Sequence, residues 1–204
     1  MQDNEIIKFK EDHQGDWKTF FKIYESDKPF WETWFFFAPL ILSAIFVITG
    51  LFFSVDFYYL LTKEILPNIF STIPSLLGFS LGGFILVVGF GSLEILRNIT
   101  ISLQKQKGFS FYQKMISVLG VSVLIQILTL SLNFTIQIIN SLGLTSDYYA
   151  STIINSIVTF VLVFLVFYSF SQLLVVVRHV FMFGQTIQAN IRIEELIEKR
   201  TEES

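Results

Sequence analysis

Six polar side chains recur along one long apolar segment of the chain, between Ser122 and Asn140. Their chemistry is hydrogen bonding, because amides and hydroxyls carry donors and acceptors but no charge. At about 100° per residue they fall in one helical sector roughly 80° wide. We call this set the polar stripe: Ser122, Gln126, Thr129, Asn133, Gln137 and Asn140. An unpaired amide is costly in an apolar environment, so each should find a partner.

Three kinds of partner could satisfy the polar stripe inside a membrane. The amides can bond to one another in a symmetric helix bundle, to a neighbouring span of the same subunit, or to water in a pore. The stripe is then an oligomer core, an internal contact or a pore lining, and a small-molecule site is a further alternative. Polar residues also alternate from Thr129 to Gln137 as in a barrel strand. One such strand cannot close a barrel, and the rest of the chain shows long unbroken apolar runs.

Glu94 is an acidic residue close to a predicted span, and Arg97 follows it by three positions. This spacing predicts an ion pair at the membrane interface. A proton or cation relay is the alternative, since an acid at this depth is a functional candidate. The sequence contains no HExxH, GxSxG or P-loop motif, and it contains no Cys. We therefore expect a protein that is not an enzyme and that binds no metal or cofactor.

The composition places these residues in a membrane protein. Of the 204 residues 52% are hydrophobic and only 15% are charged, with a mean hydropathy of +0.62, whereas soluble domains carry about 25% charged residues. Four windows contain no Lys, Arg, Asp or Glu: 34–55, 75–93, 115–144 and 148–177. Each is near or above the ~18 residues that a spanning helix needs. The predicted fold is all-α, a polytopic membrane protein with four transmembrane helices.

Basic residues predict the orientation of the chain. Of the 14 Lys and Arg residues, all except Lys63 lie before the first span, between the second and third, or after the fourth. Positive residues stay on the cytoplasmic side, so we expect a multi-pass protein of the inner (plasma) membrane with both termini in the cytoplasm. The net charge of −3 argues against direct binding of nucleic acid.

Segments outside the spans complete the predicted organisation. Residues 1–30 form a cytoplasmic segment in which Trp17, Phe20, Phe21 and Tyr24 line one face of an interfacial helix that Asp16 caps. Residues 31–182 form the four-helix transmembrane domain, and 183–204 form a cytoplasmic helix and tail. The apolar connection 56–74 is predicted to lie along the outer surface. In the fourth span the stretch VLVFLVF, residues 161–167, is predicted to face lipid.

Two helix faces are predicted to pack against other helices. Span two carries small residues on one face, including a GxxxG pair that allows close approach of another backbone: Ser75, Gly78, Gly82, Gly89 and Ser92. The C-terminal helix carries an apolar seam of Ala189, Ile193, Leu196 and Ile197. This seam is too short for a self-standing coiled coil, so we expect it to dock on a partner protein or another copy.

These features predict a non-enzymatic, homo-oligomeric inner-membrane scaffold or sensor, with span three at its centre, that docks a soluble cytoplasmic partner. The alternative is a homo-oligomeric channel or pore-forming effector in which span three lines the pore. The spans contain no ring of charged residues, which argues against selective ion conduction.

In its overall plan the chain resembles the four-span membrane subunit of Kiwa-type anti-phage defence systems. The likeness lies in the length, the two cytoplasmic ends and the lack of enzymatic motifs, and it covers architecture only. The resemblance implies a membrane-bound detector that acts through a DNA-binding soluble partner. Other small four-span defence effectors, which permeabilise the membrane, share this plan.

Overall fold

The computed structural model describes residues 16–25, 33–89, 109, 111–142 and 148–202. All regular structure in this part of the chain is helical, which confirms the predicted all-α class. The elements are α2 (Trp17–Tyr24), α3 (Trp34–Phe52), α4 (Phe57–Tyr59), the π-helix η2 (Leu60–Ile65), α5 (Leu66–Gly89), α7 (Phe111–Ser141) and α8 (Tyr148–Glu202).

Four helical segments are long and apolar enough to span a membrane: Trp34–Phe52, Phe57–Gly89, Tyr112–Ser141 and Ser151–Ala189. The prediction of four spans is confirmed at this level. The 19 residues of α3 measure about 28 Å, close to the ~30 Å of a bilayer's hydrocarbon core. The hydrocarbon core of a membrane that α3 crosses would therefore cover the whole length of this helix.

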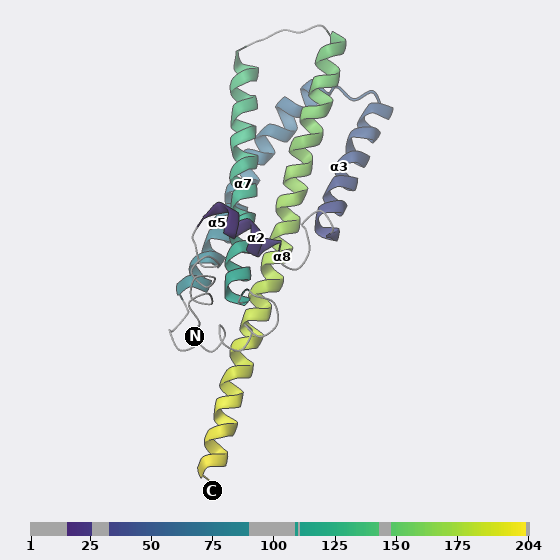
Figure 1. Cartoon of the computed structure of the whole chain (residues 1–204). Helices are drawn as coiled ribbons and strands as arrows, with labels where there is room; N and C mark the ends of the chain where they lie inside the picture. Colours follow the sequence, from purple (N-terminus) through teal and green to yellow (C-terminus); the bar gives the residue numbers. More distant parts are fainter. Residues whose placement is uncertain (1–15, 26–32, 90–108, 110, 143–147, 203–204) are drawn as a thin grey trace.

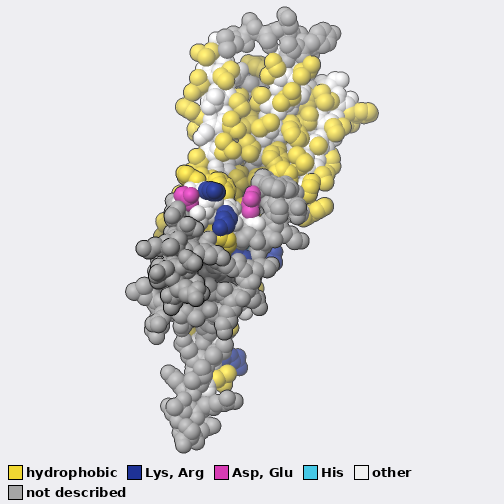
Figure 2. Space-filling view, in the orientation of Figure 1, with side chains coloured by type: hydrophobic (Ala, Val, Ile, Leu, Met, Phe, Trp, Pro, Cys, Tyr) yellow, Lys and Arg dark blue, Asp and Glu magenta, His cyan; other side chains and the backbone are white. Residues whose placement is uncertain are grey.

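The long helices α7 and α8 run antiparallel, and α5 crosses behind them at a tilt, while α3 packs on the upper part of α8 (Figure 1). The short helix α2 lies across the bundle, level with the start of α3. We call this level the α2 end and the opposite end the far end. Figure 2 shows hydrophobic side chains covering the surface above this level and charged side chains gathering at it. The α2 end thus marks one boundary of the apolar surface.

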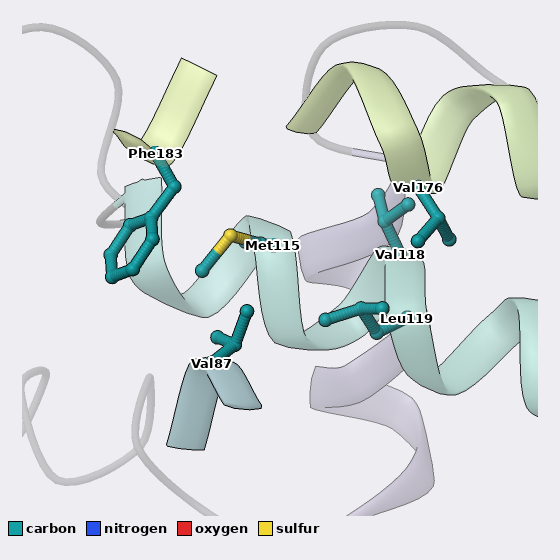
Figure 3. Packing of buried hydrophobic residues seen from close by; sticks show 6 residues of the cluster. All are labelled: Val87, Met115, Val118, Leu119, Val176 and Phe183. Atoms are coloured by element: carbon teal, nitrogen blue, oxygen red, sulfur yellow. The ribbon is translucent and has the colours of Figure 1, made fainter. Parts of the chain in front are cut away.

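Two apolar clusters hold the bundle together. At the α2 end, side chains of α5, α7 and α8 point toward one another (Figure 3): Val87, Met115, Val118, Leu119, Val176 and Phe183. Toward the far end, η2, α5 and α8 contribute Leu61, Leu66, Ile69, Ile73 and Leu162. Each cluster joins three elements, so α5, α7 and α8 form one packed unit.

The predicted surface connection is instead helical. Residues 57–89 form one continuous segment of α4, η2 and α5. Pro67 directly follows the π-helix, where the Leu66 N–H donates to the Leu61 carbonyl five residues back. Pro67 itself has no N–H and donates no helical hydrogen bond. Pro74 lies on an exposed side of α5. The second span therefore begins about eighteen residues earlier than its charge-free window.

Two predictions about the fourth span also need correction. Leu162, Val163 and Leu165 in the stretch expected to face lipid are at most 9% exposed, because α3, α5 and α7 all pack against α8. In addition, the fourth span and the predicted separate C-terminal helix are one helix, α8, without a break at residue 183. The predicted boundary between residues 182 and 183 therefore falls within a continuous helix.

Helix α2 is fixed by its cap and by a close contact with α7. The Asp16 carboxylate accepts the Thr19 N–H at 2.9 Å, as the predicted N-cap should, and its hydrogen bonds with Thr19 hold the pKa of Asp16 below its usual value. Phe20 lies directly over Gly120, where an added Cβ would meet two ring carbons at 2.8 Å. A glycine at position 120 lets α2 lie this close to α7.

Candidate functional site

The inner part of the polar stripe bonds to α5. The Gln126 Nε2 donates to the Ser80 Oγ at 3.0 Å and lies 3.4 Å from the Ser122 Oγ. The Ser80 and Ser122 hydroxyls are also 3.4 Å apart. All three side chains are fully buried. We call Ser80, Ser122 and Gln126 the polar clasp, because it ties the middle of α5 to the middle of α7.

A second contact joins α7 to the start of α5. The Asn133 Nδ2 donates to the Leu66 carbonyl at 3.2 Å, where the π-helix passes into the α-helix. The Thr129 hydroxyl donates to the Ile125 carbonyl of its own helix at 2.8 Å. Asn133 and Thr129 are both fully buried. Interhelical hydrogen bonds like that of Asn133 contribute about 0.6 kcal/mol each on average and up to ~1.7.

The polar stripe therefore divides into two parts. Ser122, Gln126, Thr129 and Asn133 are covered within the subunit, so they take up the second of the three predicted kinds of environment, an internal contact. Gln137 and Asn140, nearer the far end, are half-buried. The four covered residues need no second subunit and no water-filled lumen to be enclosed.

The region around the covered part of the polar stripe holds buried oxygen atoms that lack a hydrogen-bond donor among the described residues. Three buried oxygen atoms have no hydrogen-bond partner among the described residues: Gln126 Oε1, Asn133 Oδ1 and Thr159 Oγ1. Buried amide oxygens normally accept at least one hydrogen bond. An added negative charge at these positions would find little compensation.

A further polar contact links α2 to α8, and the sequence prediction missed it. The Tyr24 hydroxyl donates to the Gln172 Oε1 at 3.3 Å, and Tyr168 lies beside both. Burial raises the pKa of Tyr24. The available signal was Gln172 itself, which is an amide inside the charge-free run of the fourth span.

Within the described residues, the glycines of the predicted small-residue face of span two make no contact with another helix. No described atom lies within 4 Å of a Cβ built on Gly78, Gly82 or Gly89, and Ser75 is exposed. Helix α5 packs through its other side, which includes Ile73, Ser80 and Val87. Ser92 and the predicted Glu94–Arg97 ion pair lie outside the described residues.

The predicted docking seam lies on the part of α8 that extends beyond the bundle (Figure 1). Ala189 is exposed, Leu196 is 58% exposed, and the nearby Ile191 is 48% exposed. The side chains of Ile193 and Ile197 lie outside what the structure describes. Among the described side chains of α8, Phe183 and Ile187 are the last that belong to or contact the α2-end cluster.

The groups brought together are amides, hydroxyls and apolar side chains. In the part of the chain that the structure describes, no three His, Cys, Asp or Glu side chains come close enough to hold a metal ion. The arrangement can join helices and present an apolar surface. No protein-family model, curated protein or solved structure matches this chain.

Proposed function

We propose that the protein is a non-enzymatic membrane scaffold or sensor that docks a soluble cytoplasmic partner on the extension of α8. The observation that supports this is the length of α8, whose 55 residues measure about 82 Å. A bilayer core accounts for only ~30 Å of that length. The extension carries exposed Leu196 of the predicted docking seam, and exposed Ile191 lies nearby.

The extension is continuous with the packed bundle, which suits a sensor. Val176 and Phe183 join the α2-end cluster, and Gln172 bonds to α2. A shift of α2 or α5 would therefore act directly on α8. Because helices are stiff over this length, the shift would reach the docking surface.

The proposal includes the inner membrane as the location, with both termini in the cytoplasm, on the strength of the basic residues. It also includes a homo-oligomer. The open face of α5 around Gly78 and Gly82 supports this, since such faces let two helices approach closely. The architectural resemblance to Kiwa-type membrane subunits adds anti-phage defence as the proposed process.

Truncation after Ala189 should abolish partner docking while membrane insertion and the number of subunits in the oligomer stay unchanged. Phe183 and Ile187, the last contacts with the core, are retained, whereas Ile191 and Leu196 are lost. A photo-crosslinking residue at exposed Gln188 can be carried by both the full and the truncated chain. The same group at Leu174, which is 63% exposed on the spanning part of α8, is the matched control.

We expect the full chain to form a discrete adduct with a soluble protein from position 188, and the truncated chain and the Leu174 control to form none. Replacing Leu196 by Glu in the full chain should weaken the same adduct. If the full chain gave no adduct with a soluble protein while the oligomer was intact, the docking proposal would be wrong.

A further inference from the structure

A groove of about 590 Å³ lies between α2, α5 and α7. Its walls are apolar over most of their area, with Phe20 from α2, Leu81 and Phe84 from α5, and Val123 and Leu124 from α7. This volume lies within the ~300–1,000 Å³ usual for small-molecule sites. Because Gly120 has no side chain, the surface of α7 leaves room for Phe20 at this point.

The length of the groove along α7 is close to the thickness of one bilayer leaflet. Along α7 its lining runs from Tyr112 to Leu124, thirteen residues that rise about 18 Å from first to last. One leaflet contributes about 15 Å of hydrocarbon. Leu81, in the α5 wall, is 42% exposed on the apolar surface. The groove is thus placed to receive a chain from the surrounding lipid.

Polar side chains line the α2 end of the groove, and two lysines lie on α2 outside that lining. Thr19, Tyr112 and Gln113 line it there. The Lys22 Nζ lies 5.4 Å from the centre of the Phe109 ring, just before α7 begins, and the positive end of the α7 dipole is close by. Lys18 is exposed on the same short helix. Asp16 also lines the groove, but its carboxylate is engaged in capping α2.

We infer that this groove binds one acyl chain of an anionic phospholipid from the leaflet at the α2 end. The chain fills the apolar walls, and the phosphate lies by Lys22 and the start of α7. Charge complementarity selects the headgroup, because a lysine near the bilayer surface attracts anionic lipid. The bound lipid adds contacts between α2 and α7, so lipid composition adjusts how firmly α2 is held on the bundle.

The test is native mass spectrometry of the full chain, purified in mild detergent and titrated with phosphatidylglycerol or phosphatidylcholine. We expect one retained phosphatidylglycerol per chain, held roughly fivefold more tightly than phosphatidylcholine. Lys22→Gln should remove that preference. Lys63→Gln, an exposed lysine at the far end, should not. Both are surface changes, so neither threatens folding.

A second pair of variants tests the apolar walls. Val123→Trp should fill the groove and abolish retention of both lipids, whereas Ile127→Trp, on a lipid-facing position of the same helix, should leave retention unchanged. If Val123→Trp does not fold, the Lys22 and Lys63 pair decides alone. Equal retention of both lipids, unaffected by Lys22→Gln, would show only non-specific annular lipid and would overturn the inference.

Discussion

Replacing Gln126 by Glu is expected to destabilise the folded bundle by about 2.5–3.5 kcal/mol at neutral pH, the penalty for an ionised acid near the middle of a spanning helix. The substitution preserves size but exchanges the Nε2, which donates to Ser80 at 3.0 Å, for a charged oxygen. Hydrogen bonds from the Ser80 and Ser122 hydroxyls would offset only part of the cost. The free energy of unfolding in mixed micelles is the measurement.

The pH dependence gives this prediction a definite sign. A glutamate is charged above its ordinary pKa of about 4.3, and only the charged form is penalised in the folded state. The loss should therefore disappear as the pH falls toward 4 and grow as it rises. Gln137→Glu, on the half-buried part of the stripe, is the control and should cost much less. A Gln126→Glu variant as stable as wild type at pH 7 would show that the clasp is hydrated.

Replacing Leu119 by Ala is expected to cost about 2–5 kcal/mol. Leu119 is fully buried at the α2 end, where α5, α7 and α8 meet (Figure 3). Truncation leaves a cavity among Val87, Met115 and Val176, and the loss of stability grows with the volume of that cavity.

The matched control for this loss is Leu128→Ala, nine residues along the same helix. Leu128 is 50% exposed on the spanning part of α7, and its truncation should change the unfolding free energy by less than about 1 kcal/mol, because lipid replaces the lost contacts. Both variants are compared by thermal unfolding in the same detergent. Equal effects at positions 119 and 128 would mean that the α2-end cluster is not the core of the bundle.

The four spans and the cap of α2 could be predicted because their causes are local. Charge-free windows of sufficient length leave few options other than spanning helices. Asp16 marks the start of α2, because its side chain is a typical N-cap. The predicted apolar face is not the buried side: Ile23 is the buried residue of α2, whereas Trp17 and Phe21 are exposed. The start of the second span was missed, because the π-turn before Pro67 depends on a backbone adjustment that composition does not record.

The partners of the polar stripe could not be predicted, because a helical wheel identifies a face and not its neighbour. Ser80 was one serine among several small residues of span two, and only the three-dimensional packing sets it opposite Gln126. The stretch around Leu162 was misplaced for a related reason. A purely apolar helix turn suits lipid and helix neighbours equally, so its burial follows from the positions of α3, α5 and α7.

Ion flux through the wild-type protein in liposomes tests most directly whether the polar stripe is an internal contact of one subunit. We expect no flux above that of protein-free liposomes, because Ser122, Gln126 and Asn133 are fully buried and bonded within the chain. A steady wild-type conductance that Gln126→Leu removes without changing the native mass would contradict this arrangement and would assign the stripe to a hydrated pore.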